Sequence, residues 1–172
     1  MIGGLLSSNL LSQNAISGEP AYTSKVYLYN AGNECTDVTG GWTSTGYTQA
    51  PAYIKVDLTK NASDIQIYRT GTYGHVVGGT VNTIDFTNHT KLTVTGYATA
   101  LPPGSVPGII CRTSILWTSG STLFESDLTS TTGDFTLELD ITSVNSSGYV
   151  LLQGASDNGE TQNVKVYTIT LE

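Results

Sequence analysis

The sequence predicts an all-β protein, a two-sheet antiparallel β-sandwich of jelly-roll type with an N-terminal arm. In residues 135–141, apolar side chains alternate strictly with polar ones, as in a strand with one buried face. Similar short runs recur between turns rich in Gly, Asn, Ser and Thr, a spacing typical of sandwiches. The proline-rich segment 101–108 cannot continue a central strand, so it indicates a crossing between sheets and favours a jelly roll over a meander barrel.

The elements follow in chain order. Residues 1–20 are set apart as an arm, a tether or short helix, because their leucines have near-helical spacing and Gly18-Glu19-Pro20 ends the stretch. We expect the arm to dock on its own domain or on a neighbouring subunit, and the sandwich to span residues 21–172. Apolar runs predict strands at 25–30, 53–58, 64–69, 84–86, 91–97, 109–117, 135–141, 149–152 and 164–171.

The connections are predicted from turn chemistry. The Gly-rich segment 73–79 is interpreted as a loop, and Asn158-Gly159 as a hairpin turn. The last three strands are therefore expected to form a meander. The final one, residues 164–171, is apolar on both sides, so we expect it inside a sheet, with Tyr167 near the sheet end.

Composition narrows the class of protein. Charged residues make up only 12% of the chain, and Thr, Ser, Gly and Asn replace them, as is typical of extracellular or virion β-proteins. The net charge of −7 and the scattered seven basic residues argue against a nucleic-acid partner. No apolar run reaches the roughly 20 residues of a membrane span. Residues 1–6 lack the basic start of a signal peptide, so we expect release by another route, such as lysis.

The two cysteines, Cys35 and Cys111, lie far apart in the sequence. A disulfide between them is one interpretation. Two buried free thiols is the interpretation favoured for a chain made in a reducing cytoplasm.

Catalytic chemistry finds little support in the sequence. His75 and His89 are the only histidines, and neither has a nearby cysteine or a serine in a Gly-x-Ser-x-Gly turn. His75 is interpreted as a loop residue. Glu138 and Asp140 are candidates for a glycosidase acid pair, but a solvated acidic pair on the wet face of a strand explains them as well. We therefore expect no enzymatic activity.

Three segments resemble a known family. Residues 27–42, residues 84–92 and the closing pattern 135–172 are similar to β-sandwich modules of tailed-phage structural proteins, especially from phages and prophages of Gram-positive gut bacteria. The outline also resembles galactose-binding-like and carbohydrate-binding jelly rolls, whose first loop often ends in Gly-Trp, as Gly41-Trp42 does here. The resemblance covers most of residues 25–172, leaves out the arm, and transfers no catalytic residue.

The resemblance implies a role in virion structure or host-surface attachment. The implied partners are other virion proteins, copies of the chain itself and host cell-surface polysaccharide. The implied location is the virion, assembled in the host cytoplasm and released by lysis. Carbohydrate-binding jelly rolls often hold a structural calcium between the first loop and the last strand, which points to Glu34, Asp37 and Glu172. Solvated turn acids are the competing interpretation.

Sugar binding requires aromatic side chains with polar neighbours, because sugar rings stack on aromatic faces while their hydroxyl groups form hydrogen bonds. Trp42 is assigned to the core because it closes a loop onto the sandwich. A tyrosine half-buried in a strand is the competing interpretation for each tyrosine candidate. The candidates are Tyr47, Tyr73, Tyr97 and Trp117, with Arg69 and Asp64 as polar partners.

Two functions therefore stay open. The first is a non-enzymatic structural component of a tailed-phage virion, in the tail, a fibre or a capsid decoration, that attaches to host glycans. The second is a carbohydrate-binding adhesion module outside a virion.

Overall fold

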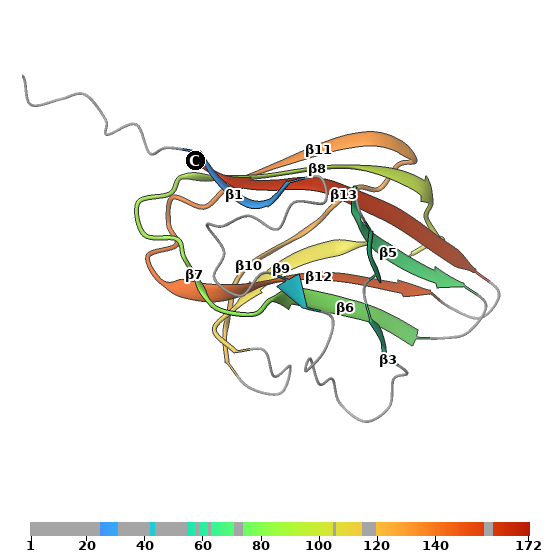
Figure 1. The fold of residues 1–172 in the computed structure, drawn as a ribbon, viewed down its shortest axis with the longest axis horizontal. Helices are drawn as coiled ribbons and strands as arrows, with labels where there is room; N and C mark the ends of the chain where they lie inside the picture. Colours follow the sequence, from blue (N-terminus) through green and yellow to red (C-terminus); the bar gives the residue numbers. More distant parts are fainter. Residues whose placement is uncertain are drawn as a thin grey trace, which may run out of the picture.

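The computed structural model describes residues 25–30, 42–43, 55–57, 59–61, 63–70, 74–104, 106–114, 120–156 and 160–172. Strands are the only regular elements in these segments, and they form two sheets that face each other as a sandwich (Figure 1). The predicted arm, residues 1–20, lies outside the described residues. Within them, no helix has the length and apolar character needed to cross a membrane.

Each sheet is built from strands distant in sequence. Sheet A runs in the order β11 (Gly133–Asp140), β8 (Lys91–Ala100), β13 (Thr161–Leu171), β5 (Ile65–Thr70) and β4 (Thr59–Lys60), and β1 (Val26–Asn30) also pairs with β13. Sheet B runs in the order β10 (Thr122–Asp127), β9 (Gly108–Arg112), β12 (Ser147–Ser156), β6 (Gly74–Thr80) and β2 (Trp42–Thr43), with β3 (Lys55–Asp57) on β6 and β7 (Ile84–Asp85) on β12.

The eight main strands have the connectivity of a jelly roll. In sheet A the order is β5-β13-β8-β11, and in sheet B it is β6-β12-β9-β10. Apart from the neighbours β9 and β10, each main strand lies in the opposite sheet from the next, as two interlocked Greek keys require. The segment 101–107 carries the chain from β8 in sheet A to β9 in sheet B. The predicted fold class and this crossing are confirmed.

The predicted meander is wrong. Strands β11, β12 and β13 lie in sheets A, B and A, so the chain crosses the sandwich twice. Asn158-Gly159, predicted as a hairpin turn, lies outside the described residues; the strands before and after it, β12 and β13, lie in opposite sheets. Alternation along a strand indicates that one face of the strand is buried, but it does not indicate in which of the two facing sheets the strand lies. The pairing partners of each strand depend on the packing of the whole core.

Two segments without clear alternation also form strands. Residues 73–79 were predicted as a loop, but residues 74–80 form β6, paired with β12, in which Gly78 and Gly79 lie opposite Leu152 and Leu151. His75 is thus a strand residue. The apolar pair 123–124 is part of the six-residue strand β10. In both cases a neighbouring strand supplies the partners that a local pattern does not reveal.

The central position predicted for the last strand is confirmed. Strand β13 pairs with β8 on one side, and with β5 and then β1 on the other. Tyr167, however, lies in mid-strand, at the register shift between Val166 and Thr168, where the partner changes from β5 to β1. A similar shift between Tyr27 and Tyr29 leaves Tyr29 buried beside Leu28, whereas strict alternation would place the two side chains on opposite faces.

The core contains apolar side chains from both sheets. Trp42 is buried as predicted, and its Nε1 donates a hydrogen bond to the carbonyl of Leu28 at 2.7 Å, which joins β2 of sheet B to β1 of sheet A. Cys111 is a buried free thiol, and burial raises its pKa to about 12. Cys35 lies outside the described residues. Fully buried members include Ile65, Ile67, Leu92, Val94, Ile109, Val150, Leu152, Val164, Val166 and Ile169.

Candidate functional site

The outer face of sheet A carries two exposed tyrosines. In β8 the side chains of Leu92, Val94 and Ala98 are buried, and Tyr97, of opposite parity, is 37% exposed. In β5 the neighbouring Ile67 is buried and Tyr68 is 44% exposed. Alternation along each strand therefore places both phenol rings on the side of sheet A that faces away from the core.

Polar residues surround these tyrosines in register. Asp134 of β11 lies opposite Tyr97, Tyr97 lies opposite Lys165 of β13, and Lys165 lies opposite Gln66 of β5. Tyr68 lies opposite Asn163, the β13 residue whose Oδ1 accepts a hydrogen bond from Gln66 Nε2 at 2.9 Å. Tyr68 and Tyr97 are thus linked by a row of side chains that can donate and accept hydrogen bonds.

Asp64 contacts this row of side chains through Lys165. Its side chain is only 5% exposed, and Oδ1 accepts a hydrogen bond from Asn61 Nδ2 at 2.6 Å. Oδ2 accepts a longer bond from Ser63 Oγ at 3.3 Å and lies 3.6 Å from Lys165 Nζ. A buried carboxylate needs such partners, and in return it restricts the position of the Lys165 ammonium group on the outer face. Asp64 therefore restricts how Lys165 lies on this surface, and its own side chain is barely accessible to a ligand.

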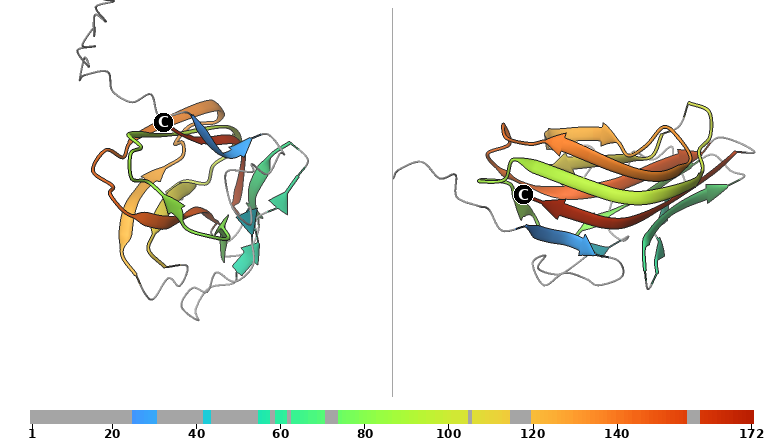
Figure 2. Two further views of the ribbon diagram at one scale, coloured as in Figure 1. Left: turned by 60° about the vertical axis from the view of Figure 1, so that its left-hand side comes forward. Right: turned by 90° about the horizontal axis from the view of Figure 1, so that it is seen from above.

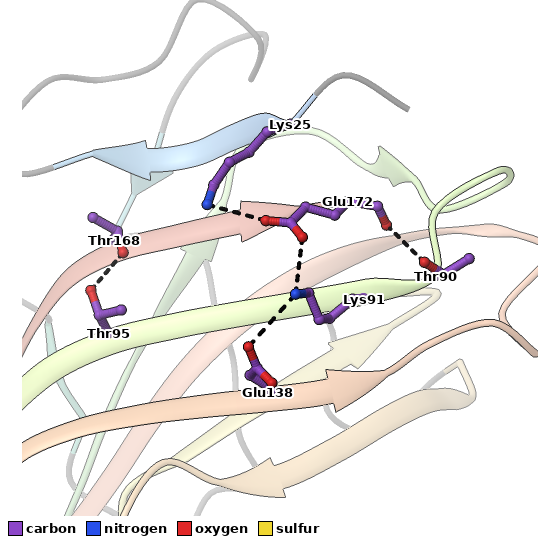
Figure 3. Close-up of polar contacts among 7 residues, drawn as sticks. All are labelled: Lys25, Thr90, Lys91, Thr95, Glu138, Thr168 and Glu172. Atoms are coloured by element: carbon purple, nitrogen blue, oxygen red, sulfur yellow. Dashed lines mark hydrogen bonds and ion pairs between the residues drawn. The ribbon is translucent and has the colours of Figure 1, made fainter. Parts of the chain in front are cut away.

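A second group of polar contacts lies at the end of sheet A where β13 ends and β8 and β1 begin (Figure 3). Glu172 Oε2 lies 2.9 Å from Lys91 Nζ, and Glu172 Oε1 lies 3.1 Å from Lys25 Nζ. Lys91 Nζ also lies 3.6 Å from Glu138 Oε1. The backbone carbonyl of Glu172 accepts hydrogen bonds from the amides of Thr90 and Lys91 at 2.6 and 3.0 Å. Glu172 therefore connects the ends of β13, β8 and β1, and Lys91 extends the group to Glu138 of β11.

Both carboxylate oxygens of Glu172, predicted as a calcium ligand, contact lysine ammonium groups. Glu34 and Asp37, the other two predicted ligands, lie outside the described residues, so the calcium site stays a prediction. Within the described segments, no group of three or more His, Cys, Asp or Glu side chains is placed to hold a metal ion.

The two lysines lower the pKa of Glu172 below its ordinary value of 4.5, the hydrogen bond from Lys91 being the larger cause and that from Lys25 the next. Glu172 in turn is the main cause that raises the pKa of Lys91. A lowered carboxyl pKa stabilises the fold above the pKa of the unfolded chain, and this contribution is lost as the pH falls through the folded pKa.

We expect Glu172→Gln to lower the thermal unfolding midpoint at pH 7 by at most about 3 °C, because exposed ion pairs are weak. The difference from wild type should shrink as the pH falls below 4.5 and through the lowered pKa of folded Glu172, and again in about 1 M salt, which screens the pairs. Glu125→Gln on β10 is the matched control. A difference between wild type and Glu172→Gln that changes neither with acid nor with salt would show that the ion pairs are not its cause.

The remaining predicted site residues are placed as follows. Arg69 lies in β5, with its backbone opposite Gln162. Tyr47, Tyr73 and Trp117 lie outside the described residues. Of the predicted sugar-binding aromatics, Tyr97 alone belongs to the described part of the chain, and it is exposed. Tyr68 was missed by the sequence analysis, although its position between Ile67 and Arg69 in a predicted strand marked it as outward-facing.

The acid pair considered for glycoside hydrolysis lies on the outward face of β11, as its alternation predicted. Glu138 contacts Lys91, and Asp140 Oδ1 accepts a hydrogen bond from the amide of Thr142 at 2.9 Å. The Thr142 hydrogen bonds lower the pKa of Asp140. A general acid for glycoside cleavage needs a raised pKa, and these hydrogen bonds act in the opposite direction at Asp140.

The outer surface of sheet B holds a shallow groove of about 520 Å³. It is lined by Gly108 and Ile110 of β9, by Glu125, Ser126 and Asp127 of β10, and by Gln153 of β12. A smaller cleft of about 320 Å³ lies where segment 101–106 meets Thr129 and Ser130.

Comparison with known proteins gives structural similarities of low score. No family model and no curated protein matches the sequence. One similar structure is the Spr0440 glycoside hydrolase domain, Endo-D, from Streptococcus pneumoniae R6, with a TM-score of 0.47, 16% identity, and coverage of 77% of this chain and 21% of that one. Another is infectious bursal disease virus Gt strain, with a TM-score of 0.33, 16% identity, and coverage of 64% and 29%. The chain thus spans less than a third of either structure's chain.

Proposed function

We propose that this chain is a non-enzymatic structural component of a tailed-phage virion, in the tail, a fibre or a capsid decoration, and that the outer face of sheet A binds host surface glycans. The observation that supports glycan binding is the exposure of Tyr68 and Tyr97 on one face, with Gln66, Asn163 and Lys165 between them. Aromatic rings that stack on sugars, flanked by hydrogen-bonding groups, are the chemistry that glycan recognition needs.

The spacing favours a chain of sugars over a single ring. Tyr97 and Tyr68 are separated by two strand spacings and one two-residue step, which puts their Cα atoms about 12 Å apart. One extended polysaccharide can contact both rings along the polar row. This row also offers both an ammonium group, Lys165, and a carboxylate, Asp134.

The tyrosines of this face lie far from the end of the sandwich at which Lys25 contacts Glu172. The C-terminus lies at one end of the sandwich (Figure 1), and there Glu172, the last residue, contacts Lys25. Tyr97 lies six residues along β8 from Lys91, roughly 20 Å from that end. A sandwich attached through its N-terminal arm at one end would therefore present the tyrosines away from the attachment point.

Binding is tested by measuring the affinity of the full chain for polysaccharides on a glycan array, followed by titration of the best ligand. We expect Tyr97→Ala and Tyr68→Ala each to weaken binding by about tenfold or more, because each removes a stacking platform. Tyr149→Ala, a half-buried tyrosine of sheet B, is the matched control and should change affinity little. Binding that is lost in Tyr149→Ala but kept in the other two would place the site elsewhere, and no binding to any glycan would remove it.

The virion role is tested on particles. Antibodies against the recombinant chain should label phage particles purified from the bacterium or prophage that encodes it. Deleting residues 1–20 should abolish incorporation while the sandwich still folds. Labelling of the cell surface without particles would favour the alternative, an adhesion module outside a virion. Particles that incorporate the truncated chain normally would refute the tether.

A further inference from the structure

The two long sides of the sandwich differ in the strands that form the sheet edges there. On one side, short additional strands extend the main sheets: β4 pairs with β5, and β2 and β3 pair with β6. On the other side, sheet A ends at β11 and sheet B ends at β10, with no further described strand beyond either. Seen from above, β10 and β11 follow one long side and β1 and β5 the opposite one (Figure 2).

Strand β11 is a regular edge. It pairs with β8 over all eight residues, Gly133 to Asp140, without a register shift, and it contains no proline and no lysine. Strand β10 differs, because its pairing with β9 shifts between Thr122 and Phe124. Proteins protect edge strands with bulges, prolines and lysines, since a row of unpaired backbone groups is a template for another strand. Strand β11 has no bulge, no proline and no lysine, and its charged side chains are all acidic.

The apolar side chains along this side are incompletely covered. Phe135, whose ring lies over Gly96 of β8, is one of several apolar residues that contact the core but stay half-exposed. Among the described residues, seven such side chains are found, and five of them lie on β10 and β11. These five are Leu123, Phe124, Phe135, Leu137 and Leu139. An added strand with apolar inward side chains would bury more of this surface.

Three of the four outward positions of β11 are acidic, and the fourth is Thr136. Asp134, Glu138 and Asp140 alternate with the inward apolar residues and are exposed. Lys91 Nζ lies 3.6 Å from Glu138 but is closer to Glu172, at 2.9 Å. The outward side of the edge therefore favours a partner strand with basic side chains at the facing positions.

We infer that β11 is the docking edge for an extended segment of another protein, one that alternates apolar with basic side chains and adds to sheet A as a further strand. Backbone hydrogen bonds would provide affinity, and the alternating side chains specificity. In a two-fold pairing of two β11 strands centred on Leu137, Asp134 would lie opposite Asp140, and like charges opposite each other destabilise a pair, so a basic partner strand is favoured over a second copy in that register. The inference does not depend on glycan binding.

The test uses the full chain and a fluorescent ten-residue peptide that alternates valine and lysine. Its controls are a peptide of the same composition in blocks and an alternating peptide N-methylated at every second residue, which removes backbone donors. Fluorescence anisotropy should show the alternating peptide binding at least about tenfold more tightly than either control. In NMR spectra, the amide signals that shift most should be those of β11.

Charge-reversal variants distinguish binding at the β11 edge from general attraction between the acidic chain and a basic peptide. Asp134→Lys/Glu138→Lys should weaken binding at least about tenfold. Asp134→Lys alone leaves the Glu138–Lys91 contact in place and should lose part of the affinity. The matched control Glu125→Lys/Asp127→Lys makes the same charge change on β10 and should keep the affinity within about threefold. Absent binding of the alternating peptide, equal binding of the block peptide, or unchanged affinity after the β11 reversal would each overturn the inference.

Discussion

Trp42→Ala is expected to lower the free energy of unfolding by about 3–5 kcal/mol, the largest effect of any substitution considered. The indole is 4% exposed and spans the two layers, since Trp42 lies in β2 of sheet B and hydrogen-bonds to Leu28 in β1 of sheet A. Truncation removes a large apolar surface from the core and leaves a cavity between the sheets. It also deprives the Leu28 carbonyl, which is buried, of the indole donor.

Equilibrium unfolding in urea, followed by circular dichroism, measures this change. Trp42→Phe keeps much of the apolar contact and loses the hydrogen bond, so it should cost about 1–3 kcal/mol. Tyr68→Ala removes an aromatic ring from the surface and should stay within about 0.5 kcal/mol of wild type. If Trp42→Ala and Tyr68→Ala have similar effects, the tryptophan does not join the sheets as described.

This link matters for the proposed attachment. Strand β1 is the first described element after the predicted arm, and it is held to the sandwich by its pairing with β13, by Trp42 and by the Lys25–Glu172 ion pair. A load applied through the arm would reach β1 first. The buried indole and the backbone ladder are the strong connections there, since the exposed ion pair adds little.

The sequence predicted the strands with clear alternation because a single buried face leaves a period-two pattern. Residues 135–141 match β11 and residues 91–97 match most of β8. It did not predict which strands pair, because a strand's apolar face is buried equally well in either sheet. The meander was wrong for this reason. Strand β6 was missed because its glycines lack the side chains that would form a pattern, and the strand is held by its pairing with β12.

The candidate binding face was predictable in part. Tyr97 was found from its type and position, and Tyr68 was available from its alternation with Ile65 and Ile67. Asp64 was assigned to the accessible surface, but contacts with Asn61 and with the distant Lys165 bury it. Glu172 was assigned to a metal, but Lys25 and Lys91 approach both of its oxygens. Contacts between residues far apart in sequence leave no local pattern.

Gly154→Ala is expected to lower the free energy of unfolding by about 2–3 kcal/mol, although it adds one methyl group. A Cβ at Gly154 of β12 would overlap Gln162 Oε1 of β13 and Ile67 Cγ2 of β5. Both residues are fully buried, so the two sheets approach closely at this point. Gln162 can give way only by moving a polar group within a dry interior, which is costly. Urea unfolding measures the difference.

The matched control is Gly108→Ala in β9 of the same sheet. A Cβ there would lie 3.3 Å from Gln153 Nε2, the end of a half-buried and flexible side chain. This variant should stay within about 0.5 kcal/mol of wild type or gain slightly, because alanine reduces the freedom of the unfolded chain. Equal losses in the two variants would show that the cost comes from the strand glycine itself and not from contact between the sheets.

Gly154→Ala also tests whether a change in the core alters the proposed binding face. Ile67 and Gln162, which a side chain at position 154 would displace, directly adjoin Tyr68 and Asn163 in their strands. A shift of these strands should therefore alter the spacing between Tyr68 and Tyr97. If the outer face of sheet A binds glycans, Gly154→Ala should weaken binding even under conditions where the variant is fully folded, whereas Gly108→Ala should not. Unchanged affinity in folded Gly154→Ala would mean that the face tolerates movement of the core beneath it.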